Sequence, residues 1–160
     1  MDQKIDLEIT INAPKQATWE VISDYGNISK YIHGVVSSHI TTEKEKGVGS
    51  TRHCDFPNMM MMKQYIVEEI TDWKEGESFS YKVLKSTAPV MGGNVDWWIS
   101  GDDTQSTIHV KIRYQTKGLM GRLMANMVRN QFAEQLNQGL VDIKEHLEKE
   151  HQMAAASNAA

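Results

Sequence analysis

The chain has 160 residues and a net charge of −4, with 40% hydrophobic and 24% charged residues. This length suits one domain with a substantial core, and the acidic balance argues against nucleic acid as a partner, since phosphate neutralisation needs a basic surface. No apolar run approaches the roughly 20 residues of a membrane-spanning helix. The single cysteine, Cys54, excludes an internal disulfide, and the polar start is unlike a signal peptide, so we expect a cytoplasmic protein.

The first segments of the chain predict a strand followed by two short helices. Residues 5–11 alternate apolar and polar side chains, which is typical of a half-buried strand. Pro14 suits the first turn of a helix, which Asn12 could cap. A second short helix is expected over residues 28–32, ending near Gly34.

The middle of the chain predicts strands joined by short turns that are rich in glycine, proline and asparagine. The expected strands are residues 35–42, 50–56, 60–73, 78–85, 95–99 and 108–114. Consecutive strands with short links pair antiparallel, and one apolar face per strand leaves one side of the sheet in water.

Residues 118–150 predict one long amphipathic helix, because apolar residues recur there at helical spacings of three and four. Such a helix must bury its stripe on the sheet, so the predicted fold class is α+β, a curved antiparallel sheet of about seven strands wrapped around a long C-terminal helix. Gly139 would allow a close approach of this helix to the sheet. We expect the domain to span residues 1–150, followed by a disordered tail over 151–160.

Three segments resemble a known family. They are Ile11-Asn12-Ala13-Pro14, Gly47-Val48-Gly49-Ser50-Thr51-Arg52 and Gly118-Leu119-Met120-Gly121-Arg122. With the element order, they resemble the helix-grip fold of the START-like (SRPBCC) superfamily, and within it the polyketide cyclase/dehydrase-like branch. The resemblance implies a cavity between sheet and final helix for an apolar or amphipathic small molecule. It implies no universal catalytic set.

Methionine and aromatic residues are the candidate lining of this cavity, because methionine adapts to irregular spaces and aromatic rings stack on planar ligands. Trp97 and Trp98 should place one indole on each face of their strand, and Tyr81 and Tyr114 offer inward hydroxyl groups. The run Met59–Met62 is either a gate over the pocket mouth or core filler. The expected ligand-binding residues are Met60, Met62, Phe79, Tyr81, Trp97, Tyr114, Met120, Met124, Met127 and Val128.

Candidates for catalysis are few. His53 and Asp55 are two residues apart on one expected strand, so they share a face and could form an acid–base pair. Alternatively, they lie on the solvated outer face while Cys54 points inward. Tyr81 and Tyr114 are the remaining candidates. The other histidines show no metal-ligand spacing, and we expect neither a metal nor a cofactor.

No acidic residue occurs between Asp103 and Glu134. Five basic residues fall in this gap: Lys111, Arg113, Lys117, Arg122 and Arg129. They form either a solvated face balanced by acids elsewhere or a surface for transient contact with anionic lipid.

The leading functional interpretation is a binding protein for a lipid, steroid or polyketide-like molecule, with no nucleic-acid partner. The alternatives are a cyclase or dehydratase that shapes a reactive chain in the same cavity, and a lipid carrier that docks at a membrane through Lys117, Arg122 and Arg129.

Overall fold

The computed structural model describes residues 2–59, 61–87, 90–116, 118–123 and 125–159. Strand β1 (Asp2–Ile11) leads into helix α1 (Lys15–Ile22) and a 3-10 helix, η1 (Tyr25–Lys30). Six strands and two helices follow: β2 (Ser37–Ile40), β3 (Thr51–Met59), β4 (Met62–Lys74), β5 (Ser78–Ser86), β6 (Val90–Gly101), β7 (Ser106–Thr116), α2 (Gly118–Leu123) and α3 (Ala125–Asn158).

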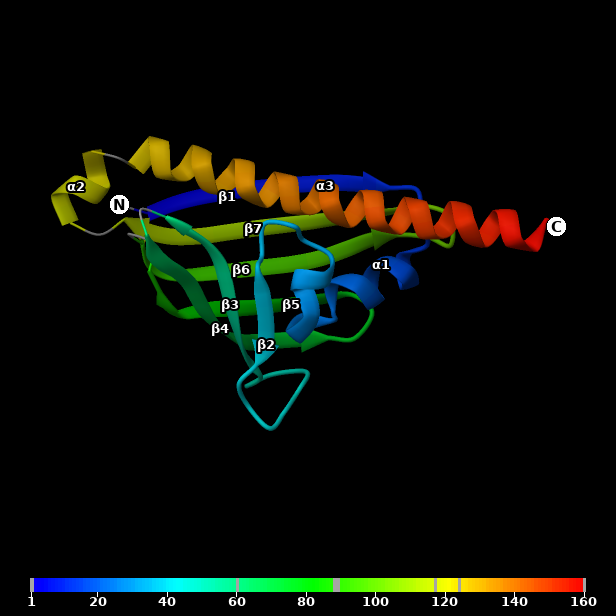
Figure 1. Ribbon diagram of the computed structural model, residues 1–160, viewed down its shortest axis with the longest axis horizontal. Helices are drawn as coiled ribbons and strands as arrows, with labels where there is room; N and C mark the ends of the chain where they lie inside the picture. The colour runs from blue at the N-terminus through cyan, green and yellow to red at the C-terminus, as the bar shows by residue number, and fades with distance from the viewer. Residues whose placement is uncertain (1, 60, 88–89, 117, 124, 160) are drawn as a thin grey trace.

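The strands form one antiparallel sheet in the order β1-β7-β6-β5-β4-β3-β2. The last strand therefore lies beside the first, while the other strands follow one another as hairpins. Helix α3 runs along the sheet next to β1, and α1 and η1 cover the sheet near the end opposite α2 (Figure 1). This arrangement confirms the predicted helix-grip fold.

Alternation along the strands sets the inner face of the sheet. In β7 every second residue is buried from Ser106 to Thr116. The second half of α3 buries Leu140, Ile143 and Leu147 in the same core. Polar contacts also hold α3 to the end of β1: the Lys144 ammonium donates to the backbone carbonyl of Thr10 at 2.8 Å. The C-terminal part of α3 is therefore the clamp of the fold.

The C-terminal region differs from the single helix expected over residues 118–150. The structure describes two helices there, α2 and α3, which run in different directions (Figure 1), and residue 124 between them lies outside the described residues. Helix α3 then continues to Asn158, so residues 151–158 are helical where an irregular tail was expected. Their side chains are exposed, and alanine, the strongest helix former, extends a helix without burial.

Local contacts revise three further expectations. A Cβ at Gly139 would stand 3.2 Å from Cγ2 of Ile32, so the close approach is to the segment after η1 rather than to the sheet. Pro14 occupies the N-cap of α1 without a side-chain cap, and Asn12 instead accepts a hydrogen bond from Gln105. The glycines at 92 and 93 lie within β6 rather than in a turn before it. Gly92, with a φ of +52°, sits at a register shift in the strand pairing.

Candidate ligand-binding site

An aromatic wall lines the inner face of the sheet. Phe79 and Tyr81 of β5, Trp97 of β6 and Tyr114 of β7 are all buried there. Phe79 stacks on Trp97 with ring centroids 5.9 Å apart, and Tyr25 of η1 lies over Phe79 and Tyr81 at 6.2 and 6.1 Å. The structure therefore brings four of the expected ligand-binding residues to one surface. Their role in binding stays a prediction.

A buried ion pair stands beside this wall. Arg52 of β3 and Glu68 of β4 are direct partners in the sheet register, and each side chain is less than 10% exposed. Arg52 Nε and Nη2 lie 2.8 and 2.6 Å from Oε2 of Glu68. Arg52 Nη1 donates to the backbone carbonyl of Tyr25 at 3.0 Å, and the guanidinium lies 4.0 Å from the centre of the Tyr25 ring. We call Tyr25, Arg52, Glu68, Tyr81 and Trp97 the inner polar cluster.

The electrostatics of the inner polar cluster leave one positive and one negative charge. Burial alone would lower the pKa of Arg52, but Glu68 and weaker neighbours more than offset this, and the pKa is raised. Burial, opposed by Arg52, raises the pKa of Tyr25, and burial together with Glu68 raises the pKa of Tyr81. Burial also raises the pKa of the nearby Cys54 thiol to about 11. The tyrosines and the thiol are therefore neutral at physiological pH, and Cys54 is not an activated nucleophile.

Four buried polar atoms of the described residues have no hydrogen-bond partner. They are Tyr25 Oη, Trp97 Nε1, Tyr114 Oη and Thr116 Oγ1. The Trp97 indole lies near enough to the Tyr81 hydroxyl to contribute to lowering its pKa, although no acceptor for the indole stands in hydrogen-bonding geometry. A buried polar group without a hydrogen bond lowers the stability of the folded state by about 1–3 kcal/mol. Such groups therefore indicate a hydrogen-bond partner from outside the chain.

Sequence reasoning missed Tyr25, Arg52 and Glu68 as members of this site. The sequence does contain a signal for the ion pair. Arg52 is two residues from Cys54 on the same strand, so both side chains point to the inner face. Glu68 likewise stands two residues from the buried Ile70. A charged residue at an inward strand position, opposite a countercharge on the next strand, is the pattern that identifies such a pair.

His53 and Asp55 do form a pair, but on the outer face. Nε2 of His53 lies 3.0 Å from Oδ1 of Asp55, and the His53 ring stacks between His39 and Tyr65. Hydrogen bonds from Ser37 and His53 lower the pKa of Asp55. Cys54 between them is buried, as the alternation predicts. The candidates for catalysis therefore lie on opposite sides of the sheet and do not form one constellation.

Where the structure describes their side chains, the expected methionines do not line the inner face of the sheet. Met62 and Met127 are 60% and 55% exposed, which places both at the surface, and Met61 is almost fully exposed. Core filling is thus the wrong interpretation for Met61 and Met62. Met60 and Met124 lie outside the described residues, as do the side chains of Met120 and Val128.

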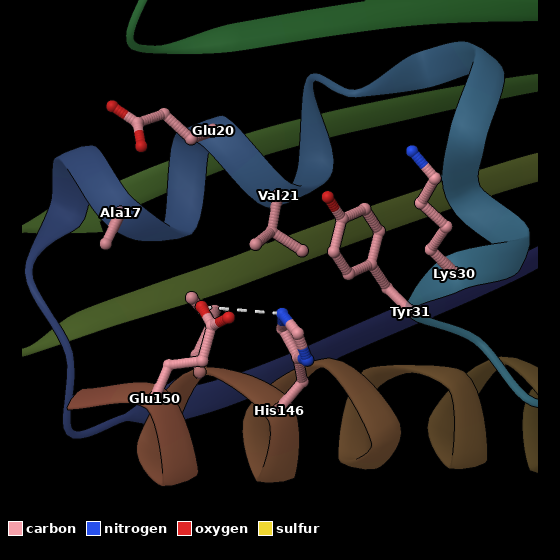
Figure 2. Close-up of a pocket in the computed structure, with 8 residues that line it drawn as sticks. Ala17, Glu20, Val21, Lys30, Tyr31, His146 and Glu150 are labelled. Carbon is pink, nitrogen blue, oxygen red and sulfur yellow. Dashed lines mark ion pairs between the residues drawn. The ribbon is translucent and has the colours of Figure 1, made fainter. Parts of the chain in front are cut away.

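A separate pocket of about 410 Å³ lies between α1, η1 and α3. Val21 and Leu147 are its buried residues, while Glu20 and Glu150 are exposed at its rim. Figure 2 shows the ion pair of His146 and Glu150 on α3 facing α1 across the pocket, at 3.5 Å. None of the expected ligand-binding residues lines this pocket. Its charged rim does not match the apolar cavity that the sequence predicts.

Comparison with known proteins identifies the family. A family described as polyketide cyclase / dehydrase and lipid transport matches residues 2–148. The chain belongs to this family. Among curated proteins, none matches the sequence. Within the described residues of the chain, no helix is long and apolar enough to cross a membrane. The same residues contain no group of three or more side chains placed to hold a metal ion.

Solved structures share the fold of this family member at low sequence identity. Ara h 8.0201 superposes with a TM-score of 0.74 at 16% identity, covering 92% of this chain and 98% of its own. The protein TTHA0849 from Thermus thermophilus gives 0.76 at 15% identity, covering 91% and 97%. XoxI from Bacillus cereus gives 0.73 at 14% identity, covering 90% and 94%. These similarities show the START-like fold.

Proposed function

We propose that the protein binds a hydrophobic or amphipathic small molecule, of the lipid, steroid or polyketide class, between the inner face of the sheet and α3. The observation that carries the proposal is the set of unpartnered polar atoms within a buried aromatic wall. Pockets for small molecules combine apolar lining with a few placed polar groups, which is the composition of this wall. We also propose a cytoplasmic location, since the one cysteine is buried and free.

Tyr114 connects the sheet side of the proposed site to α3. Its ring packs edge-on against Phe132 of α3, with centroids 5.8 Å apart. Burial raises the pKa of Tyr114, so its hydroxyl keeps its proton and can donate. A carbonyl or hydroxyl oxygen of the ligand would satisfy this group without adding charge.

We expect freshly purified protein to retain a small-molecule mass in native mass spectrometry. We also expect the neutral probe N-phenyl-1-naphthylamine to bind, with a change in tryptophan fluorescence because Trp97 belongs to the wall. The proposal is contradicted if no mass is retained and no lipid, steroid or polyketide probe alters the fluorescence.

The variant Tyr114→Phe separates a ligand-facing hydroxyl from a merely structural one. Removing an unpartnered buried hydroxyl should raise the free energy of unfolding by about 1 kcal/mol. The same change should weaken binding of an oxygen-bearing ligand, such as the steroid progesterone, roughly 3- to 10-fold, since one hydrogen bond is lost. Urea unfolding and fluorescence titration measure the two effects.

Tyr65→Phe is the matched control for this variant, because Tyr65 stacks on His53 at the outer face. We expect it to leave progesterone affinity unchanged. Equal affinity of wild type and Tyr114→Phe would show that the Tyr114 hydroxyl does not meet the ligand.

A lipid carrier that exchanges its cargo at an anionic membrane is the second candidate function. The C-terminal ends of β3 and β5 lie at the same end of the molecule as α2 (Figure 1). Residues 56–67, 78–95 and 104–133, which reach this end, contain no acidic residue. Their lysines and arginines are Lys63, Lys82, Lys85, Lys111, Arg113, Lys117, Arg122 and Arg129. Lys82 and Arg113 are ion-paired with Glu69 and Asp96 on the outer face.

Exposed apolar side chains accompany this positive charge. Leu119 and Leu123 on α2 and Met61 beside β4 are each at least 75% exposed. Apolar groups surrounded by cations are the composition of surfaces that insert at anionic bilayers. This end of the molecule, defined by Met61, Leu119 and Leu123, is therefore the proposed membrane-contact surface.

We expect the protein to co-sediment with phosphatidylcholine vesicles that contain roughly 30% phosphatidylglycerol at low salt, and to be released at about 0.5 M salt. The double variant Leu119→Asp with Leu123→Asp should lose this binding. Met153→Asp, a change at an exposed position at the far end of α3, should keep it. No binding of the wild-type protein at low salt would decide against the carrier function.

A further inference from the structure

We infer that the ligand presents an uncharged hydrogen-bond acceptor, such as an amide, ester or ketone oxygen, to the inner polar cluster, and that the cluster disfavours a carboxylate. This inference rests on the proposed function and narrows the class of ligand. A lone buried arginine would select anions, and the surroundings of Arg52 remove that preference.

The positive charge of Arg52 is already matched. Among the described residues, the buried acidic and basic side chains are Arg52, Glu68 and Asp142. Asp142 is engaged elsewhere, since it accepts the backbone N–H of His33 at 2.9 Å. Each guanidinium nitrogen of Arg52 has an oxygen partner, and the Tyr25 ring covers one face of the group. A ligand carboxylate would therefore meet Glu68 as a second negative charge in a poorly solvated place.

The unpartnered groups of the cluster call for a neutral acceptor. Trp97 Nε1 can only donate a hydrogen bond, and no acceptor stands in hydrogen-bonding geometry to it, although the Tyr81 hydroxyl lies nearby. Tyr25 Oη is also without a partner, and the raised pKa of Tyr25 keeps its proton in place. The Tyr25 and Tyr81 rings are 6.1 Å apart, and Tyr81 is close to Trp97. The Tyr25 and Trp97 rings both pack against Phe79, so the two donors belong to the same part of the aromatic wall, where a ligand oxygen could accept from them.

The test compares two probes that differ in charge and hardly in shape, decanamide and decanoate. Each competes with N-phenyl-1-naphthylamine for the wild-type protein at about pH 7.5, where the carboxylate is ionised. We expect decanamide to displace the probe with an affinity at least about tenfold higher than that of decanoate, because a carboxylate costs far more to desolvate than an amide and is repelled by Glu68.

Charge variants assign the preference to the cluster. Glu68→Gln leaves Arg52 without a countercharge, so it should shift the ratio of affinities toward decanoate by at least about tenfold, and decanoate should raise its melting temperature. The double variant Arg52→Gln with Glu68→Gln carries no charge at the site and should prefer decanamide, as the wild type does. If Glu68→Gln does not fold, the ratio of decanamide to decanoate affinity in the wild type decides the question.

The outcomes separate this inference from the proposed function. Equal or tighter binding of decanoate by the wild type overturns the inference and leaves small-molecule binding intact. The same holds if folded Glu68→Gln keeps the wild-type ratio. If N-phenyl-1-naphthylamine and both decanoyl compounds fail to bind the wild type, the proposed function and the inference fall together.

Discussion

Replacing Glu68 with alanine is expected to lower the free energy of unfolding by about 3–5 kcal/mol. The change leaves Arg52 buried without its countercharge, and an uncompensated charge in the interior is strongly destabilising. Arg52 cannot relieve this by losing its proton, because arginine stays charged in proteins. Urea unfolding of purified wild type and variant, followed by circular dichroism, measures the difference.

Two controls separate the buried charge from other effects of the substitution. Glu69→Ala removes the neighbouring carboxylate, which pairs with Lys82 at a half-exposed position, and should change stability by less than about 1 kcal/mol. The double variant Arg52→Met with Glu68→Leu removes both charges and should stay near wild-type stability. If Glu68→Ala is as stable as the double variant, the Arg52 guanidinium is not held in the interior in the way that the structure shows.

Much of the fold follows from periodicity in the sequence. Alternation along β1 and β7 places apolar residues inward, and helical spacing in α3 marks the stripe that includes Leu140, Ile143 and Leu147. The different directions of α2 and α3 have no such signal, because apolar spacing continues from one helix into the other. The glycines of β6 are typical of a turn, whereas they form an irregularity inside a strand, which depends on the neighbouring strands.

The candidate site is predicted less completely. Phe79, Tyr81, Trp97 and Tyr114 are assigned correctly to the inner face, because each occupies an apolar position of an alternating strand. Pairing of Arg52 with Glu68 depends on strand register, which a one-residue slip would change. Tyr25 reaches the site from η1, so no strand pattern could place it. Periodicity therefore identifies the apolar wall, while the polar groups that would select a ligand emerge from the tertiary structure.

Replacing Leu140 with alanine is expected to lower the free energy of unfolding by about 3–5 kcal/mol, through lost burial and the cavity that remains. Leu140 is 1% exposed and belongs to the core shared by α3 and the sheet. The matched control on the same helix is Met153→Ala, which is exposed and should change stability by less than about 0.5 kcal/mol. A loss below about 1 kcal/mol for Leu140→Ala would contradict the role of α3 as the clamp.

The two ends of α3 should respond differently to truncation because they are packed differently. Leu140 and Ile143 are fully buried, whereas Met127, near the start of the helix, is more than half exposed. Met127→Ala should therefore leave stability nearly unchanged. Met127 is one of the ligand-binding residues expected from the sequence, so its truncation should alter N-phenyl-1-naphthylamine affinity, while Leu140→Ala should affect unfolding far more than affinity. Such a reversal would place the clamp and the binding region on separate turns of one helix.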